Sequence, residues 1–307
     1  MSFDLTEINR RMRSDPVGFA EECDAAYFAE VTGIAGRITQ NIHRSHIILL
    51  AGPSGSGKTT TALNIERELD RIGLETHTIS MDDYYQDVDP LTTPRNAQGE
   101  YDFESPELLD LALLQEHFQA LDAGEEIVIP HYDFHSRKRD MSQGRTLRLG
   151  QNEIALFEGI HALNGKITGR GSGAGAFKLY ISARSDVEQE GKTVFKGTWM
   201  RMLRRVIRDV KFRNTSAVNT FAMWENLRVG EKRFISPYKN SADVLCDTSL
   251  AYEVGLLRNF SEGIFDGLPE SMPRREEALR MRRMLELFEP MDAAFLSERS
   301  LMHEFVG

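Results

Sequence analysis

Residues 51–60 read Ala51-Gly52-Pro53-Ser54-Gly55-Ser56-Gly57-Lys58-Thr59-Thr60 and fit the phosphate-binding pattern G-x-x-x-x-G-K-[ST] at every fixed position. The apolar run 46–50 is typical of a buried parallel strand, and residues 61–69 have apolar side chains at helical spacing. This pattern binds nucleotide phosphates when it lies between a strand and a helix, and a glycine-rich turn with a chance Lys-Thr pair is the alternative. The segment therefore predicts a nucleoside triphosphate site.

The residue types of this loop explain how it would bind phosphate. Its glycines let the backbone curl so that successive N–H groups point at phosphate oxygens, and the positive end of the next helix adds to the attraction. The Lys58 ammonium would reach the β- and γ-phosphates, and the Thr59 hydroxyl would bind Mg²⁺. The nucleotide is expected to contact Gly52, Ser54, Gly55, Ser56, Gly57, Lys58, Thr59 and Thr60.

The composition argues against several classes of protein. Of 307 residues, 41% are hydrophobic and 27% charged, as in ordinary globular proteins. No run of about 20 apolar residues predicts a membrane span, and the first residues lack a secretory signal pattern. Two distant cysteines, Cys23 and Cys246, favour a reduced, cytoplasmic setting. A net charge of −10 argues against nucleic acid as a partner, because binding its backbone needs a basic face.

The apolar pattern predicts an α/β protein with a mostly parallel sheet flanked by helices. Residues 1–45 predict a helical N-terminal extension, 46–250 a nucleotide-binding domain, and 251–307 a helical C-terminal extension packed on that domain. A helix is expected to begin at Ser105-Pro106. Besides the strand before the loop, strands are predicted at 75–80, 126–130, 152–160, 177–182 and 241–246.

Two acidic residues are predicted at strand ends. Asp82 follows the strand 75–80, and Glu158 lies at the end of the next long apolar strand. Ligands of open α/β sheets bind beyond the carboxyl ends of the strands, so both carboxylates would face the crevice of the phosphate loop. Asp82 could accept the proton of an attacking hydroxyl or organise Mg²⁺, and Glu158 suits a second Mg²⁺-binding carboxylate. The alternative for each is a side chain that only caps a turn or strand.

Three further segments combine residue types suited to small ligands. Phe103 could lie against a flat ring and Glu104 could accept hydrogen bonds from hydroxyls, although such a pair is also common in packed loops. Residues 131–139 are dense in rings and cations, which suits a base or a sugar. Between 200 and 215, Arg201, Arg204, Arg205 and Arg208 recur at helical steps and share one helix face.

A cationic face in an acidic protein indicates a bound anion, and arginine forks suit phosphoryl oxygens. We therefore expect an arginine-rich lid around 200–215, in which replacing Arg201, the earliest of the four arginines, costs little. A solvated or salt-bridged helix is the alternative.

Six motifs occur in the order typical of one family. They are Gly52–Thr60, Asp82–Tyr85, Phe103–Pro106, Pro130–Phe134, Phe157–Ile160 and Arg204–Asp209. The chain thereby resembles the uridine kinase and phosphoribulokinase superfamily of P-loop kinases, from about residue 25 to the end. Segments such as Glu158–Asn164, Gly230–Lys232 and His303–Gly307 are similar to bacterial uridine-kinase-like nucleoside kinases. The resemblance implies a P-loop NTPase fold.

The resemblance also implies roles for single residues. Asp82 matches the base that takes the proton of a nucleoside 5′-hydroxyl, and Glu104 matches an acid on the ribose hydroxyls. Thr59 and Glu158 match the Mg²⁺ shell. Three arginines match the lid residues that close over the substrate and the transferring phosphate: Arg205, Arg208 and Arg213. The catalytic set would then be Lys58, Asp82, Arg208 and Arg213. The acceptor pocket would include Tyr85, Phe103, Tyr132, Phe134 and His135.

These features predict ATP- and Mg²⁺-dependent phosphorylation of a small hydroxylated acceptor, such as the 5′-hydroxyl of uridine or cytidine. One alternative is a kinase of another sugar or sugar phosphate. A second is a nucleotide-dependent switch, which is disfavoured because the chain has no Asn-Lys-x-Asp guanine-reading segment. A third is a regulatory protein that binds ATP without turnover. The sequence leaves open the acceptor and whether the protein is a homo-oligomer.

Overall fold

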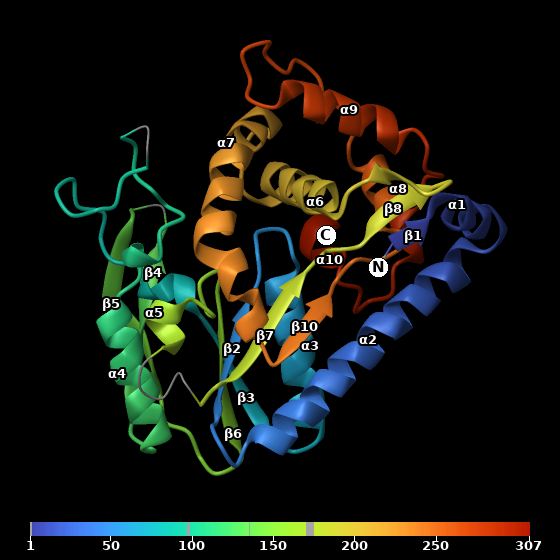
Figure 1. The fold of residues 1–307 in the computed structure, drawn as a ribbon. Coiled ribbons are helices and arrows are strands. Elements are labelled where there is room, and N and C mark those ends of the chain that lie inside the picture. The colour runs from blue at the N-terminus through green and yellow to red at the C-terminus, as the bar shows by residue number, and fades with distance from the viewer. Residues whose placement is uncertain (1, 97–98, 135, 170–174) are drawn as a thin grey trace.

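A computed structural model describes residues 2–96, 99–134, 136–169 and 175–307 (Figure 1). Its centre is a five-stranded parallel sheet in the order β10-β7-β2-β6-β3. The strands are β2 (Ile47–Ala51), β3 (Glu75–Ser80), β6 (Glu153–Glu158), β7 (Phe177–Ser182) and β10 (Val244–Asp247). The predicted α/β fold with a parallel sheet flanked by helices is confirmed.

Strand β2 shows how the sequence places this sheet at the centre. All five of its residues are buried. Ile48 and Leu50 belong to the hydrophobic cluster on one face of the sheet, whereas Ile47 and Leu49 belong to the cluster on the other. Successive side chains of a strand point to opposite faces, so a strand that is covered on both sides is apolar throughout.

Two helices precede the central sheet, and the second of them covers one of its faces together with α3 (Lys58–Arg71). They are α1 (Leu5–Ser14) and α2 (Pro16–Asn41), and the Asp15 carboxylate between them accepts a hydrogen bond from the Gly18 N–H. The long helix α2 packs along α3, which follows the phosphate loop (Figure 1). The Tyr27 and Thr61 hydroxyl oxygens lie 3.0 Å apart at this contact.

A small three-stranded sheet was not predicted. Strand β1 (Ser2–Asp4) runs parallel to β8 (Asp186–Gln189), which pairs antiparallel with β9 (Lys192–Phe195). Strands of three or four residues contain too few alternations to be recognised from sequence alone. This sheet joins the beginning of the chain to the segment that precedes the arginine-rich helix.

The segment between β3 and β6 corrects two predictions. Strand β4 (Ile127–Asp133) does not join the central sheet but pairs antiparallel with β5 (Lys138–Leu147), which was not predicted. The helix expected at Ser105-Pro106 is only the 3₁₀ turn η2 (Pro106–Leu108), and α4 (Leu111–Asp122) begins after it. Proline at the first position suits a 3₁₀ turn as well as an α-helix, so it did not indicate the length of the element.

The remaining helices and turns include the arginine-rich helix α6, which packs against α7, α8 and α10 (Figure 1). Their bounds are η1 (Met81–Tyr84), α5 (Gly165–Thr168), α6 (Gly197–Phe212), α7 (Ala217–Gly230), the π-helical turn η4 (Glu231–Ile235), η5 (Ser236–Ser241), α8 (Glu253–Asn259), α9 (Arg275–Leu285), η6 (Ala293–Phe295) and α10 (His303–Val306).

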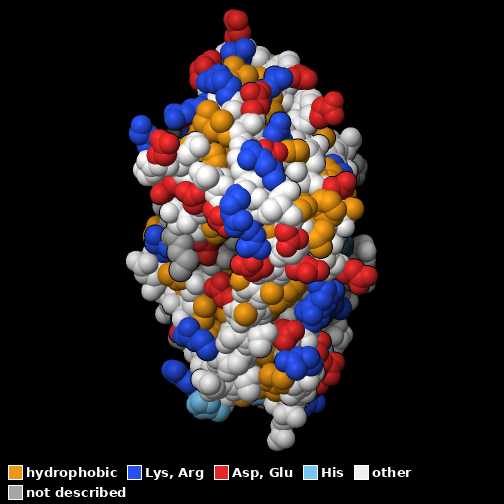
Figure 2. Space-filling model, turned by 90° about the vertical axis from the view of Figure 1, so that its right-hand side faces the viewer, with side chains coloured by type: hydrophobic (Ala, Val, Ile, Leu, Met, Phe, Trp, Pro, Cys, Tyr) orange, Lys and Arg blue, Asp and Glu red, His pale blue; other side chains and the backbone are white. Residues whose placement is uncertain are grey.

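The surface shows no extended basic area on the face seen in Figure 2, where Lys and Arg side chains alternate with Asp and Glu. This face therefore offers no continuous cationic track for a nucleic-acid backbone. Within the described residues, no helix has both the length and the apolar character that crossing a membrane requires.

Candidate active site

The phosphate loop connects β2 with α3, and its path depends on two glycines in the left-handed region. Gly55 and Gly57 have φ values of +73° and +82°, which other residues rarely adopt. A Cβ atom on Gly55 would lie 2.5 Å from the Arg201 carbonyl oxygen, and one on Gly57 would lie 2.6 Å from Leu301 Cδ1. Within the described part of the chain, the N–H groups of both glycines have no hydrogen-bond partner, so they are available to an anion.

A cavity of about 190 Å³ lies beside this loop, at the carboxyl edge of the central sheet. Asp82, in η1 after β3, and Glu158, at the end of β6, reach the same edge because the strands are parallel. Most of the predicted site residues line this cavity: Ser54, Gly55, Gly57, Lys58, Thr59, Asp82, Tyr85, Phe103, Glu104, Glu158, Arg205, Arg208 and Arg213.

The other predicted residues do not line the cavity. The Ser56 side chain is fully buried, and a Cβ on Gly52 would lie 2.3 Å from the Ile181 carbonyl oxygen, so this glycine permits a close backbone contact. Thr60 is turned toward α10, while Tyr132 and Phe134 lie behind Tyr85. His135 lies outside the described residues.

Burial dominates the electrostatics of the phosphate end of the cavity. It lowers the pKa of Lys58, although Glu158 and Asp82 nearby act in the opposite direction. It also raises the pKa of Asp82, against the Lys58 charge, and raises the pKa of Glu158 to about 7. Desolvation disfavours the charged form of each group. A charged ligand that pairs with these side chains would remove part of this penalty.

Three aromatic rings form a wall next to the cavity. Tyr85, Tyr132 and Phe134 meet edge to face, with ring centroids 5.1 to 6.1 Å apart. The β4–β5 hairpin brings the last two rings to Tyr85, and the Tyr132 N–H donates to the Asp83 carboxylate at 3.3 Å. Phe134 is largely exposed. This wall can pack against a flat ligand.

Glu104 lines the same cavity and links the aromatic part to the arginines. Burial raises the pKa of its carboxyl to about 7, and the Arg205 charge opposes that shift. Arg205 also donates a hydrogen bond of 2.6 Å to the Ser54 hydroxyl in the phosphate loop. An acid that binds acceptor hydroxyls would therefore lie close to a cation that contacts the phosphate loop.

The arginines that line the cavity share one partner. Asp209 forms ion pairs with Arg205, Arg208 and Arg213 at 3.2, 3.3 and 3.8 Å. One carboxylate cannot neutralise three guanidinium groups, so this cluster keeps a positive charge toward the cavity. Such an arrangement suits the oxygens of a phosphoryl group.

Arg201 and Arg204 reach the phosphate loop from α6 as Arg205 does, but neither is open to an anion in the cavity, as the prediction required. These side chains are 2% and 0% exposed. Arg201 pairs with Glu231 at 2.6 Å, and Arg204 pairs with Glu253 at 2.5 Å. The two arginines belong to a salt-bridged interior, because each guanidinium group is enclosed by a buried carboxylate and the phosphate loop.

Comparison with known proteins supports a kinase site. Residues 47–251 match the family described as the Phosphoribulokinase / Uridine kinase family. The chain belongs to this family. The matched range contains every residue named above that lines the cavity, and it runs from β2 to the turn before α8.

Two relatives in this family are uridine kinases. The chain is 30% identical over 200 residues to the enzyme of Staphylococcus haemolyticus, which covers 65% of this chain and 86% of the relative. It is 29% identical over 214 residues to the enzyme of Pectobacterium carotovorum, which covers 68% and 89% respectively. A solved structure from Silicibacter sp. TM1040, described as a fructose transport system kinase, superposes on this chain with a TM-score of 0.52 at 17% identity. The superposition covers 70% of this chain and 98% of the Silicibacter chain. That likeness supports the fold alone.

The donors present in this member of the kinase family fit Mg²⁺ bound together with a nucleotide. Among the described residues, no group of three or more His, Cys, Asp and Glu could hold a metal ion by itself. Thr59 and Glu158 supply one hydroxyl and one carboxylate in the same cavity. Mg²⁺ in kinases is commonly bound by one or two protein oxygens, with phosphate oxygens and water completing the shell.

Two charged residues that line the cavity were not predicted, Glu231 in η4 and Glu304 in α10. Both lie in segments that resemble bacterial uridine-kinase-like proteins, Gly230–Lys232 and His303–Gly307. That signal could have marked them as candidates. It could not indicate that either side chain reaches the phosphate loop.

Proposed function

We propose that the protein transfers the γ-phosphoryl group of ATP to the 5′-hydroxyl of a nucleoside of the uridine or cytidine type. The observation that supports this most is that Lys58, Asp82 and Glu104 line one cavity. A phosphate-binding cation, a base and an acid for hydroxyl groups are the parts that such a transfer requires. The two uridine kinase relatives favour the same class of acceptor.

The proposed reaction is an in-line displacement. The acceptor hydroxyl gives its proton to Asp82, its oxygen forms a bond to the γ-phosphorus, and the bond from that phosphorus to the β,γ-bridging oxygen breaks. ADP and the phosphorylated acceptor are the products. The raised pKa of Asp82 makes its carboxylate a stronger proton acceptor than an exposed aspartate. Mg²⁺ held by Thr59 and Glu158 would neutralise phosphate charge.

The remaining residues would position the substrates. Lys58 and the N–H groups of the loop would bind the triphosphate, while Arg208 and Arg213 would stabilise charge on the phosphoryl group during transfer. Tyr85 and its neighbouring rings would pack against the base. Glu104 would accept hydrogen bonds from the ribose hydroxyls.

A coupled assay of ADP formation against nucleosides, free sugars and sugar phosphates tests this proposal. Uridine or cytidine should give the highest kcat/KM, with phosphate on the 5′-oxygen of the product by phosphorus NMR. A highest kcat/KM with a free sugar or a sugar phosphate would reject the nucleoside and assign that alternative acceptor. MgATP binding without turnover of any acceptor would reject a kinase and leave a regulatory ATP-binding protein.

A further inference from the structure

The carbonyl groups of the phosphate loop are held by side chains, most of which do not line the cavity. The carbonyl oxygens of residues 53–56 each accept a hydrogen bond from a side chain. Lys58 Nζ donates to the carbonyl oxygen of residue 53 at 3.4 Å, and Arg201 Nη1 donates to that of residue 54 at 2.9 Å. Arg204 Nη1 donates to the carbonyl oxygen of residue 55 at 3.4 Å, and Thr248 Oγ1 donates to that of residue 56 at 2.7 Å. We call Arg201, Arg204 and Thr248 the loop bracket.

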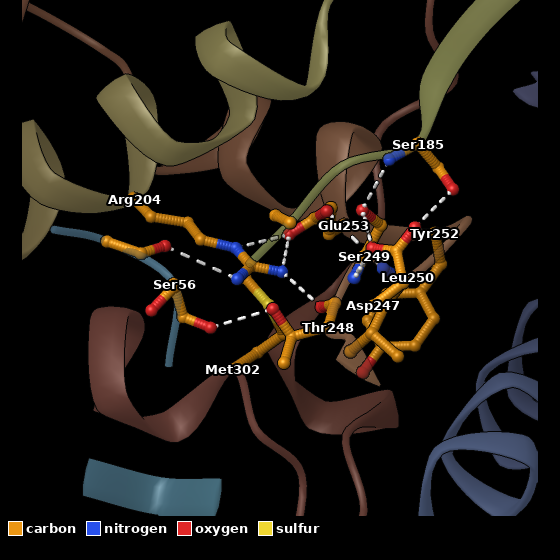
Figure 3. Close-up of polar contacts among 12 residues, drawn as sticks. Ser56, Ser185, Arg204, Asp247, Thr248, Ser249, Leu250, Tyr252, Glu253 and Met302 are labelled. Atoms are coloured by element: carbon orange, nitrogen blue, oxygen red, sulfur yellow. Dashed lines mark hydrogen bonds and ion pairs between the residues drawn. The ribbon is translucent and has the colours of Figure 1, made fainter. Parts of the chain in front are cut away.

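The two bracket arginines are fixed by partners other than the loop. Arg204 Nε donates to Glu253 Oε2 at 2.6 Å, and Arg204 Nη2 donates to the Thr248 carbonyl oxygen at 2.7 Å (Figure 3). Arg201 donates to both carboxylate oxygens of Glu231, at 2.6 and 3.0 Å. A guanidinium group has five donors in a rigid plane, so each arginine can hold a carboxylate on one edge and a loop carbonyl on another.

Thr248 lies in a turn that is equally restrained. Its side chain is fully buried and, in Figure 3, lies between Arg204 and Ser56. The preceding Asp247 carboxylate accepts hydrogen bonds from the Ser249 and Ser185 hydroxyls, both at 2.7 Å. The hydroxyl that reaches the loop therefore comes from a fixed backbone.

The orientation of a carbonyl decides where the next N–H group points. In a planar trans peptide unit the two point in opposite directions. Holding the carbonyls of residues 54 and 56 outward therefore turns the N–H groups of Gly55 and Gly57 the other way, and neither of these two N–H groups has a partner among the described residues. We propose that the loop bracket positions these N–H groups for nucleotide phosphates, an inference that rests on the proposed function.

A purely structural role would require fewer contacts. A buried arginine needs only its carboxylate to hold α6 in place, and such ion pairs can often be replaced by neutral side chains at little cost in stability. Arg201 and Arg204 nevertheless reach two consecutive loop carbonyls. Thr248 carries no charge to neutralise, yet it forms the shortest of the four hydrogen bonds. The positioning role therefore predicts an effect on nucleotide binding beyond any effect on folding.

The variant Thr248→Val provides the sharpest test, because it removes one hydroxyl without changing the shape of the side chain. The dissociation constant of MgADP, measured by calorimetry on the whole chain, should rise roughly 5- to 10-fold, as expected for the loss of one buried hydrogen bond. The acceptor KM should stay within about twofold. The matched control is Thr76→Val, since Thr76 is buried and donates to the Leu74 carbonyl at 3.2 Å, away from the loop. The Tm of Thr76→Val should fall by about as much as that of Thr248→Val, but its dissociation constant for MgADP should not change.

A double variant, Arg204→Met with Glu253→Gln, tests the arginine without leaving a buried charge. The amide introduced by Glu253→Gln keeps an oxygen for the Leu250 N–H, which donates to the Glu253 carboxylate at 3.3 Å, so the variant should fold. MgADP binding should weaken by at least the factor seen with Thr248→Val. If the wild type binds MgADP and both variants bind it equally well, the bracket is purely structural and the proposal fails. If the wild type does not bind MgADP at all, the proposed function fails and the bracket with it.

Discussion

Glu304 accepts two hydrogen bonds from Thr60, one from the backbone N–H at 3.2 Å and one from the hydroxyl at 2.9 Å. The two residues are 244 positions apart in the chain and meet at the first turn of α3. Arg208 Nη1 lies 3.8 Å from the other carboxylate oxygen. The first N–H groups of a helix have no partner within the helix, so this carboxylate uses a donor that an anionic ligand could also use.

Replacing Glu304 with Gln should therefore strengthen nucleotide binding. The amide keeps the shape of the side chain but no longer repels the phosphates or competes as an anion for the Thr60 N–H. We expect the dissociation constant of MgATP to fall about 3- to 10-fold, with a larger effect at low ionic strength. Glu298→Gln, which removes an exposed charge from the preceding segment, should have no such effect. Weaker binding by Glu304→Gln would instead mean that the carboxylate contributes directly to holding the nucleotide or its metal ion.

Lys58→Ala should lower kcat by a factor of about 10² or more, because it removes the cation that neutralises the transferring phosphate. The fold should survive, since burial already disfavours the charged ammonium and its hydrogen bond to the Pro53 carbonyl oxygen is long at 3.4 Å. Thr59→Ala should likewise retain its Tm and require more Mg²⁺ for activity. Steady-state kinetics at saturating MgATP would measure the loss of turnover in both variants, and thermal denaturation would measure whether their folds survive. Turnover at the wild-type rate in both variants would remove the phosphate loop from the mechanism.

Asp82→Asn should keep MgATP binding but lose about 10²- to 10⁴-fold in kcat, because an amide cannot take the proton of the acceptor. Burial raises the pKa of Asp82, so its carboxylate forms at higher pH than that of an exposed aspartate. In the wild type, kcat/KM for the acceptor should accordingly rise with pH through this raised pKa. The variant should lack that rise. Lost MgATP affinity with an unchanged maximal rate would make Asp82 a metal ligand and place the base elsewhere.

Glu104 should make the unliganded protein less stable at alkaline pH. Burial raises its pKa from 4.5 to about 7. Because the folded pKa lies above the unfolded one, the stabilising contribution is present in full below pH 4.5 and is lost as the pH rises through about 7. Glu104→Gln removes this titration, so at pH 8 its free energy of unfolding should exceed that of the wild type by on the order of 1–3 kcal/mol.

Urea denaturation between pH 4 and pH 8 would measure this difference, which should disappear toward pH 4. Glu126→Gln is the matched control, because Glu126 is exposed and its replacement should shift neither end of the profile. Glu104→Gln should also raise the acceptor KM, since its amide offers a weaker acceptor to hydroxyl groups. Parallel stability profiles for the wild type and Glu104→Gln would show that this carboxyl is ionised equally in the folded and unfolded states.

The parts of the fold and cavity that could be predicted have local or periodic signals. The loop motif identifies β2 and α3 by itself, and the placement of Asp82 and Glu158 at one edge follows from the parallel strands. The contact of Glu304 with Thr60 could not be predicted, because it joins a four-residue helix to a segment 244 positions away. Helical spacing likewise groups Arg201 with Arg205, and both contact Ser54. It could not predict that Glu231, from a segment 30 positions later, pairs with Arg201 and closes it off from an anion.

The arginines of α6 should respond differently to replacement by alanine. Arg208→Ala should lower kcat about 10²- to 10³-fold with a smaller effect on the KM for MgATP, because its charge acts mainly on the phosphoryl group during transfer. Arg205→Ala should mainly raise the acceptor KM, since the Arg205 charge opposes the rise in the pKa of Glu104, the acid proposed to bind the acceptor hydroxyls. Both variants should fold, because Asp209 retains two other arginine partners in each case.

Arg201→Ala is the contrasting variant, and the expectation that it costs little is reversed by the structure. Removing this guanidinium leaves Glu231, whose side chain is 1% exposed, with Arg228 as its one counter-charge among the residues that the structure describes. Breaking a buried ion pair costs about 3–5 kcal/mol, so thermal denaturation should show a large loss of stability together with weakened MgADP binding. Kinetics and Tm measured on all three variants separate the two groups of arginines. Small and equal effects throughout would mean that α6 is a solvated helix in solution, and that neither a lid nor a loop bracket contributes to the reaction.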